Sequence, residues 1–407
     1  MEEWKTYKLK DICIKVTDGS HFSPEGIEDG YPMFSVKDML EYGFDYSKCK
    51  RISEIDFNKM KSSGCVPQKG DVLVAKDGSF LKQIFVCEET MDEAILSSIA
   101  IFRPDTSKVC PEYLCYLIKS PKVYDYISKN CVSGSALPRI VLKAFKEVEL
   151  DIPSLDMQKS IVTRLKCIDD KIRINNRINH NLEEQAQVLY KSYFVDFEPF
   201  KDGKFVDSEL GMIPEGWRVA ELGTVTRQNS QKVKDRIDVK VLSPVTTGEL
   251  VLSEEYFTKQ VFSESISKYI VVKPLHFAYN PARVNIGSIG MNMFSFDGCV
   301  SPVYVVFECE KGYHHFFDYY RKTESFKDEV LNRAIGGVRQ TLSYKDFALI
   351  KLVYPPYDIV EKFNCIYAGL LENKNSIKRE ISKLSELRDT LLPKLLSGEL
   401  KIDDFTC

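Results

Sequence analysis

Two long segments of the chain repeat hydrophobic residues at alternating intervals of four and three, the pattern that forms the seam of a coiled coil. They cover residues 161–189 and 363–395. A helix with such a seam is not stable alone in water, so each segment requires a partner helix. The hydrophobic seam residues that we expect to contact the partner are Ile161, Leu165, Ile172, Leu182, Leu189, Phe363, Leu370, Ile377, Ile381, Leu384 and Leu391.

Both seams also contain polar residues. Asn175 and Asn179 interrupt the first seam, and Lys374 and Arg388 occupy positions in the second. Such residues fix the register and orientation of a helix pair at some cost in stability. About 32 residues at 1.5 Å per residue make each helix roughly 50 Å long. We predict that the two helices pack antiparallel against each other, and the alternative is long amphipathic helices within one body.

The rest of the chain shows shorter patterns that are typical of mixed α and β structure. Apolar stretches rich in β-branched residues and bounded by Gly, Pro and Asn predict strands. Aromatic residues and leucines at intervals of three and four predict helices packed on a sheet. The predicted strands include residues 71–75, 95–102, 269–272 and 303–307, and the predicted helices lie within residues 111–129 and 314–335.

The chain repeats itself once. Residues 133–145 match residues 336–347 at an offset of 202, which places Phe145 on Phe347. The same offset continues through the two long segments, where Leu182 falls on Leu384. Near the start of each copy, W-K-T-Y-K-L matches W-R-V-A-E-L at an offset of 213. The first globular segment is therefore about eleven residues longer than the second.

These patterns predict an α+β protein with a pseudo-two-fold repeat. Two mixed α/β domains are separated by two long antiparallel coiled-coil helices. The predicted boundaries are residues 1–152 for the first domain, 153–200 for the central helix, 201–353 for the second domain with its N-terminal linker, and 354–407 for the C-terminal helix and tail.

Composition excludes several classes of protein. Hydrophobic residues make up 44% of the chain at a mean hydropathy of −0.22, and no run approaches the roughly 18 apolar residues of a membrane span. The N-terminal segment lacks the basic start and apolar core of a secretory signal, so we expect a cytoplasmic protein with reduced thiols. The 12 scattered cysteines are therefore expected to be small core residues rather than disulfide partners or zinc ligands.

Several segments closely resemble the conserved regions of specificity subunits from type I restriction-modification systems. Residues 152–165 read I-P-S-L-D-M-Q-K-S-I-V-T-R-L, residues 168–183 read I-D-D-K-I-R-I-N-N-R-I-N-H-N-L-E, and residues 189–200 read L-Y-K-S-Y-F-V-D-F-E-P-F. The match continues with D-S-E-L-G-M-I-P-E-G-W at residues 207–217 and L-R-D-T-L-L-P-K-L-L-S-G-E-L at residues 387–400. The globular segments match the family more loosely, at residues 17–22, 70–78 and 279–290.

The resemblance implies a noncatalytic subunit that reads DNA. Each globular domain would be a target recognition domain that enters the major groove and reads one half of a two-part target. The helix pair would set the gap between the halves, since roughly 50 Å corresponds to about fifteen base pairs at 3.4 Å per pair. The family often has Glu-Gln where this chain has Met157-Gln158 and Ile359-Val360, so a partner contact through that glutamate is not implied.

The resemblance also implies partners. Two methyltransferase subunits would flip and methylate an adenine in each half of the target, and restriction subunits would drive translocation and cleavage. S-adenosylmethionine, ATP and Mg are expected in these partner subunits, and no cofactor is expected on this chain. The implied ligand of the chain is double-stranded DNA.

Catalytic motifs are missing from the sequence. It contains no phosphate-binding loop of the G-x-x-x-x-G-K-[ST] type and no G-x-G-x-x-G after a strand. The adjacent His314 and His315 are interpreted as part of a helix surface rather than as a metal-ligand pair. The segment at residues 280–283, N-P-A-R, lacks the second proline and the aromatic residue of an amino-methyltransferase motif.

Polar, glycine-containing loops are the candidates for DNA contact. Arg and Lys can donate to guanine, Asn and Gln can pair with adenine, and Ser or Thr can hold phosphates. The candidates are Ser20, His21, Lys76, Ser79, Lys82, Ser135 and Arg139 in the first domain, and Arg227, Asn229, Gln231, Lys232, Asn280, Arg283, Asn285, Arg339 and Gln340 in the second. Each loop could also be an ordinary turn.

The net charge of −3 is unusual for a nucleic-acid-binding protein, unless the 56 basic residues are concentrated locally. It leaves open a second class of function, a coiled-coil scaffold or protein-interaction module without DNA specificity. A third interpretation is that the chain reads DNA for a fused methyltransferase-nuclease.

Overall fold

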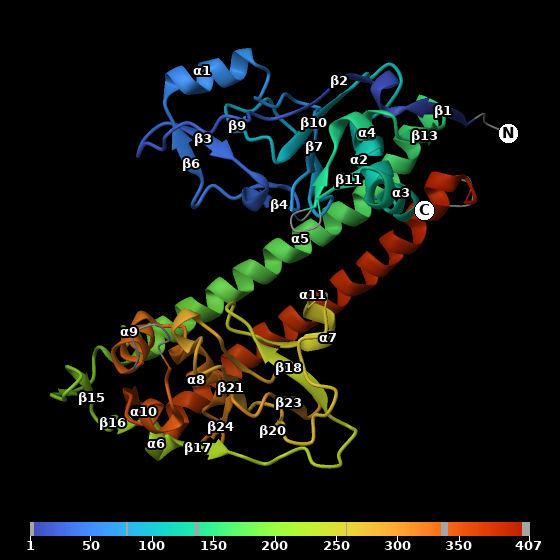
Figure 1. Cartoon of the computed structure of the whole chain (residues 1–407). Coiled ribbons are helices and arrows are strands. Elements are labelled where there is room, and N and C mark those ends of the chain that lie inside the picture. The colour runs from blue at the N-terminus through green and yellow to red at the C-terminus, as the bar shows by residue number, and fades with distance from the viewer. Residues whose placement is uncertain (1–3, 79, 135–137, 258, 335–340, 401–407) are drawn as a thin grey trace. The chain divides into compact units, whose positions relative to one another are not determined.

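The chain forms two compact units, each of which draws on both long helices. The computed structural model describes residues 4–78, 80–134, 138–257, 259–334 and 341–400 (Figure 1). Unit 1 comprises Met1–Asn176 and Arg379–Cys407, and unit 2 comprises Arg177–Lys378. The chain therefore passes between the units twice, both times inside a long helix. The predicted α+β class with its internal repeat is confirmed.

Unit 1 contains a four-stranded antiparallel sheet in the order β2-β10-β7-β8 (Figure 1). These strands are β2 (Cys13–Asp18), β10 (Ile99–Pro104), β7 (Val72–Ala75) and β8 (Ile84–Val86). Every residue of β7 is buried, because one face of the sheet packs against helices and the other against a second sheet. A strand covered on both faces reads as a continuous apolar run, which explains why residues 71–75 predicted a strand.

The second sheet of unit 1 has the order β6-β3-β9, with β3 antiparallel to β6 and parallel to β9. Its strands are β3 (Tyr31–Phe34), β6 (Lys50–Ile52) and β9 (Ala94–Ile95), and α1 (Glu54–Ser62) follows β6. The Ser53 hydroxyl caps α1 by accepting a hydrogen bond from the backbone N–H of Asp56. Shorter elements are η1 (Leu9–Asp11), η2 (Val36–Asp38), β4 (Met39–Leu40), β5 (Gly43–Phe44), β11 (Val132–Ser133) and β12 (Arg139–Ile140).

The predicted helical region at residues 111–129 forms two helices, α2 (Pro111–Lys119) and α3 (Pro121–Asn130). Each begins with a proline at its first position, where the missing N–H has no intrahelical partner to lose. A proline disfavours helical geometry in the residue before it, so Ser120, which precedes Pro121, separates the two helices. The unit is completed by α4 (Leu142–Lys146) and by β1 (Lys5–Lys8), which pairs with β13 (Glu149–Ile152).

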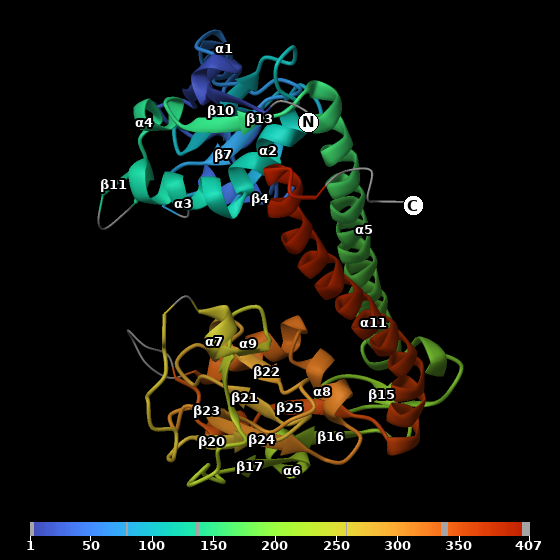
Figure 2. The same ribbon diagram turned by 90° about the vertical axis from the view of Figure 1, so that its right-hand side faces the viewer.

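Unit 2 repeats the first sheet in the order β17-β24-β21-β22 (Figure 2). Its strands are β17 (Thr226–Asn229), β24 (Val305–Cys309), β21 (Phe277–Tyr279) and β22 (Ile289–Met291). The second sheet has the order β19-β18-β23-β20, built from β19 (Leu250–Leu252), β18 (Lys240–Pro244), β23 (Gly298–Val300) and β20 (Ile270–Val272). Like β3 in unit 1, β18 is antiparallel to one neighbour, β19, and parallel to the other, β23.

The helices of unit 2 are α6 (Leu222–Val225), α7 (Ser253–Tyr256), α8 (His314–Tyr320), α9 (Glu324–Arg333) and α10 (Tyr344–Phe347). The remaining elements are η3 (Glu198–Phe200), β14 (Phe205–Val206), β15 (Ile213–Pro214), η4 (Val284–Ile286), and β16 (Arg218–Glu221) paired with β25 (Lys351–Tyr354).

The repeat extends to strand register. In unit 1, Lys5 pairs with Ile152, and in unit 2, Arg218 pairs with Tyr354. These four residues are related by the two sequence offsets, 213 for the first strand and 202 for the second. Phe145 and Phe347 are both buried, and they lie in short helices, α4 and α10, that match at the offset of 202.

The long helices are α5 (Leu155–Phe194), with 40 residues, and α11 (Tyr357–Ser397), with 41. Both are longer than the predicted 32 residues, because the helical backbone continues beyond the seam where the ends pack into the two units. In unit 1, Asp169 pairs with Arg388 at 3.1 Å, and Asn175 donates to Glu380 at 3.0 Å. The residue number rises along one helix as it falls along the other, which confirms the antiparallel orientation.

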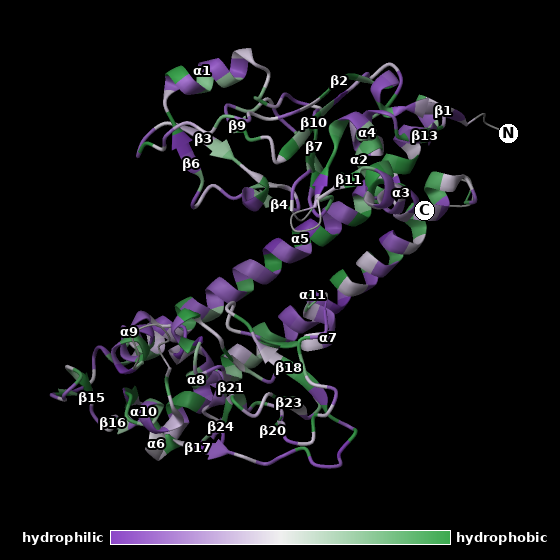
Figure 3. Ribbon diagram, in the orientation of Figure 1, coloured by the Kyte–Doolittle hydropathy of each residue, from purple (hydrophilic) through white to green (hydrophobic). Residues whose placement is uncertain are grey.

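Burial along the predicted seam is uneven. Ile161, Leu165, Ile172 and Phe363 are buried, whereas the other seven seam residues named above are half-buried. Two helices alone cannot enclose a seam residue from every side, and Ile161, Leu165 and Phe363 are also covered by the core of a unit. Purple and green residues alternate along both helices in Figure 3.

Two of the cysteines differ from expectation. Cys167 and Cys365 are exposed on α5 and α11, since their positions lie off the seam. Buried core cysteines, as expected, are Cys65, Cys87, Cys115, Cys131 and Cys299. Within the described part of the chain, no helix is both long enough and apolar enough to cross a membrane.

Candidate nucleic-acid interface

Three of the loops predicted to contact DNA meet at one end of the four-stranded sheet of unit 1. The first follows β2 (residues 18–21), the second follows β7 (residues 76–78), and the third is the segment at residues 138–140. The backbone N–H of Ile140 donates to the Lys76 carbonyl at 2.9 Å, and that of Gly78 donates to the Pro138 carbonyl at 2.9 Å. Sequence-distant loops are thus joined by main-chain bonds.

Ion pairs connect the same three loops in a chain of alternating charge. Lys76 Nζ lies 3.1 Å from Asp18 Oδ2 and 3.5 Å from Asp77 Oδ1. Asp77 Oδ1 in turn lies 3.1 Å from Arg139 Nε. At the other end, His21 Nε2 lies 3.5 Å from Asp18 Oδ1. We refer to Asp18, Lys76, Asp77 and Arg139 as the unit 1 charge chain.

The members of this set differ in exposure. Lys76 is buried, with 4% of its surface exposed, so its ammonium group faces protein carboxylates rather than solvent. The side chains of Arg139 and His21 are 61% and 73% exposed. Lys82, between β7 and β8, is also exposed, and the Ser20 hydroxyl donates to the Phe22 carbonyl at 2.8 Å. Arg139, His21 and Lys82 are therefore the predicted side chains that are open to a ligand here.

The candidate list omitted two features of this surface. Asp18 and Asp77, the acidic members of the charge chain, each begin an Asp-Gly-Ser sequence, and this shared triplet was the available signal. Gly19 is needed there because a Cβ would lie 2.2 Å from the Ile95 carbonyl oxygen. The second feature is Phe22, which is 58% exposed and lies beneath Lys59 of α1, at 5.5 Å from Nζ to the ring centroid.

Unit 2 has the same loop junction with different side chains. The N–H of Leu342, which corresponds to Ile140 at the offset of 202, donates to the Pro281 carbonyl at 3.1 Å. Asn280 Oδ1 accepts from the backbone N–H of Ala282 at 3.0 Å, which shapes the loop, and Arg283 is exposed. Asn285 is half-buried in η4 of the same loop.

The other predicted residues of unit 2 lie on and after β17. Arg227, Gln231 and Lys232 are exposed, whereas both ends of the Asn229 amide are engaged. Asn229 Nδ2 donates to the Val271 carbonyl at 3.2 Å, and Oδ1 accepts from the N–H of Gln231 at 2.9 Å. β24 lies between β17 and β21, so this group and the Asn280 loop are separated by one strand. Ser79, Ser135, Arg339 and Gln340 lie outside the described residues.

Comparison with known proteins finds similar chains among type I specificity subunits. The family model described as the type I restriction modification DNA specificity domain matches residues 1–184. The MjaIX specificity subunit of Methanocaldococcus jannaschii is 28% identical over 99% of this chain and 95% of its own length. The HindI specificity subunit of Haemophilus influenzae is 24% identical over 98% of this chain and 100% of its own. Over almost its full length the chain is similar to specificity subunits of type I restriction enzymes. A specificity subunit determines the DNA target of its system and is not itself catalytic.

A solved specificity subunit has a similar fold. The crystal structure of the S subunit from M. genitalium superimposes with a TM-score of 0.56 at 15% identity, covering 97% of this chain and 96% of that chain. At this identity the similarity concerns the fold alone.

The pair of adjacent histidines is half-buried at the start of α8 rather than on a helix surface as predicted. The rings of His314 and His315 lie 4.2 Å apart, and His315 also packs on Tyr367 of α11, which explains the burial. Burial and the neighbouring His314 lower the pKa of His315 to about 4. No group of three metal-ligating side chains occurs among the described residues.

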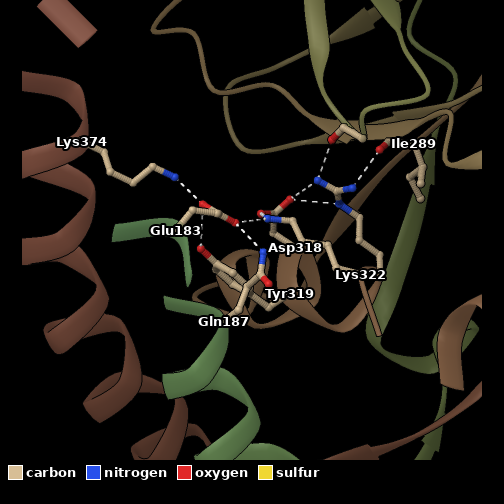
Figure 4. A network of polar contacts seen from close by, with 9 residues as sticks. Glu183, Gln187, Ile289, Asp318, Tyr319, Lys322 and Lys374 are labelled. Carbon is tan, nitrogen blue, oxygen red and sulfur yellow. Dashed lines mark hydrogen bonds and ion pairs between the residues drawn. The ribbon is translucent and has the colours of Figure 1, made fainter. Parts of the chain in front are cut away.

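A second polar network, within unit 2, joins both long helices to the rest of that unit (Figure 4). Glu183 of α5 pairs with Lys322 at 2.9 Å, with Lys374 of α11, and accepts from the Tyr319 hydroxyl at 3.4 Å. Burial raises the pKa of Glu183, but Lys322 and Lys374 lower it more, and the resulting pKa is about 2. Glu183 is therefore ionised near neutral pH and ties α5, α8 and α11 together.

Proposed function

We propose that the chain directs a type I restriction-modification complex to a two-part DNA sequence, with each unit reading one half. The Asp18–Arg139 surface of unit 1 and the Asn280–Arg283 surface of unit 2 would contact DNA. The chain would bind no cofactor of its own.

One observation carries this proposal. The four-stranded sheet with the loop junction at its end occurs in both units, but the side chains at the junction differ. Lys76 and Asp77 follow the strand in unit 1, whereas Pro281 and Ala282 occupy the corresponding loop in unit 2. Two domains that recognise different DNA sequences need the same backbone with different side chains at the contact surface. The reason is that side-chain donors and acceptors distinguish the edges of the bases.

The partners follow from the family. The two relatives are named as specificity subunits of the MjaIX and HindI type I restriction enzymes. We propose that this chain likewise assembles with two methyltransferase subunits, which bind S-adenosylmethionine and methylate adenine, and with restriction subunits, which use ATP and Mg. The long helices are the surfaces proposed for this assembly.

Sequencing of methylated DNA tests the proposal. Cells without other adenine methyltransferases would express this chain with the methyltransferase encoded beside it, and the genome would be sequenced for methylated adenine. The expected result is one motif made of two short blocks with an unread gap of fixed length. Cells that express the methyltransferase alone are the control and should lack the motif. A contiguous motif, or methylation independent of this chain, would contradict the proposal.

The dependence of binding on salt concentration distinguishes the proposed function from the alternative of a protein scaffold. Binding of the complex to duplex DNA should weaken steeply as salt rises, because phosphate contacts release counterions. A scaffold would show binding to its protein partners that is insensitive to both DNA and moderate salt.

A further inference from the structure

The unit 1 charge chain contains one cation that cannot reach a ligand and one that can. Lys76 is enclosed between Asp18 and Asp77, at 3.1 and 3.5 Å. Arg139 has 61% of its side chain exposed, although it shares Asp77 with Lys76. A buried lysine is retained where two carboxylates balance its charge, and here one of these carboxylates also holds the exposed arginine.

Arg139 is held at both its backbone and its side chain. It forms an antiparallel bridge with Asp77, and its neighbours Pro138 and Ile140 bond to Gly78 and Lys76. Asp77 contacts the guanidinium at Nε, the nitrogen nearest the backbone. This ion pair restrains the guanidinium at the end nearest the backbone, while 61% of the side chain stays exposed.

We propose that Arg139 reads one guanine in the half-site of unit 1, and that Lys76 is a positioning residue that acts on Arg139 through Asp77. The proposal rests on the proposed function above and names a residue for one base of the target. An arginine can donate two parallel hydrogen bonds to guanine O6 and N7, and this geometry demands a fixed guanidinium plane. Holding the plane in advance removes the ordering entropy that would otherwise weaken the contact.

Unit 2 provides an internal comparison. Its loop has Pro281 and Ala282 in place of a lysine and an aspartate, so neither residue can supply a charge to orient a neighbouring arginine. Changes to the unit 1 charge chain should therefore affect one half of the motif and leave the other half unchanged.

The test uses the complete methyltransferase complex and a library of duplexes with randomised half-sites. After reaction, methylated duplexes are sequenced, and base preference is measured at each position. Arg139→Lys keeps the charge but removes the planar fork, and Arg139→Ala removes both. In both variants, preference for guanine should fall by about 10-fold or more at one position of one half-site.

Asp77→Asn and Lys76→Met probe the positioning step. Each should weaken the preference for guanine at the position that responds to the Arg139 variants. The loss should be smaller than in those variants, because Arg139 itself is intact. A merely structural residue would instead lower total methylation with base preference unchanged. If Lys76→Met fails to fold, Asp77→Asn alone tests the positioning step, because asparagine preserves the shape of the aspartate side chain. Lys122→Met is the matched control, because Lys122 is an exposed lysine of unit 1 that pairs with Asp151 on another surface.

The outcomes are distinct. Unchanged preference in both Arg139 variants overturns the assignment of Arg139, and a changed position that differs between Asp77→Asn and Arg139→Lys overturns the positioning role. A wild-type complex without a two-part motif contradicts the proposed function itself, whereas a two-part motif that lacks a guanine sensitive to Arg139 contradicts only this inference.

Discussion

Glu183 is a single carboxylate between Lys374 of α11 and Lys322 of the turn that follows α8, and its side chain is 26% exposed. The pairs are therefore less screened by water than surface pairs are. Loss of the charge would leave Lys322 and Lys374 together without their shared partner, since Glu183 accounts for the ion pair of Lys374 and one of the two of Lys322. Like charges left adjacent are destabilising.

Glu183→Gln should lower the free energy of unfolding of unit 2 by about 2 kcal/mol at neutral pH, the usual size of a lost bond to a charged group. The pKa of Glu183 is depressed from 4.5 to about 2, so its stabilisation is present above pH 4.5 and is lost as pH falls toward 2. Denaturant melts at several pH values should show wild type and variant converging over that range.

Glu147→Gln is the control for this experiment. Glu147 also has a pKa of about 2, because Lys10 and Lys8 donate to it, but its pairs are at the surface. Water and salt screen such pairs, so this substitution should change stability little. An equal loss in both variants would show that enclosure between helices adds nothing to the Glu183 pairs.

At the scale of elements, the end of α11 belongs to the core of unit 1. Leu392, Leu395 and Leu396 are buried in the same cluster as Tyr113 of α2 and Leu165 of α5. A segment near the C-terminus therefore completes a domain whose strands lie within residues 5–152.

Leu395→Ala should destabilise unit 1 by about 2–4 kcal/mol, through lost burial and the cavity that remains. Leu395 is 1% exposed, whereas Leu387 on the same helix is 46% exposed. Leu387→Ala is accordingly the matched control and should change stability by less than about 0.5 kcal/mol. Hydrogen exchange resolved by residue should show faster exchange in β7 and β10 but not in β21 and β24. Equal acceleration in both units would contradict this assignment.

The long helices allow a second experiment at this scale. Both crossings between units lie within helices, after Asn176 and after Lys378. Inserting one heptad at each crossing preserves the seam and adds about 10 Å to each helix. We expect the gap of the methylated motif to grow by about three base pairs, with both half-sites unchanged. The matched control inserts seven residues into an exposed loop and should leave the gap unaltered.

Element types were predictable because they depend on local patterns. Apolar runs predicted β7, β20 and β24, whereas the run at residues 95–102 is divided between the end of β9 and the start of β10. The two offsets anticipated the equal registers of β1–β13 and β16–β25. The lengths of α5 and α11 were underestimated, because their ends pack on domain cores rather than along the seam. The three-dimensional meeting of Asp18, Asp77 and Arg139 depends on long-range folding, and no local pattern encodes it. The assignment of loops to DNA contact stays a prediction.

At the scale of the whole molecule, each unit has a hydrophobic core of its own, but unit 1 is built from two separate stretches of the chain. Exchanging residues 1–150 for the corresponding domain of another specificity subunit should change one half of the motif and keep the other half. The incoming domain must still pack on Leu392, Leu395 and Leu396 of α11, so donors with small or polar residues facing them should yield less folded protein. The methylated motif and the soluble yield measure these two effects separately. A change in both halves would show that the units do not read independently.

The division of unit 1 between both ends of the chain has a consequence during synthesis. Residues 1–176 leave the ribosome long before Leu392, Leu395 and Leu396 do, and the whole of unit 2 is made in between. The domain that is translated first is therefore the last to be finished, and its unfinished apolar face stays open throughout. A truncated product of translation retains that open face, which is the kind of surface that chaperones and proteases recognise. Under the function proposed above, defective copies would then be removed before they could assemble.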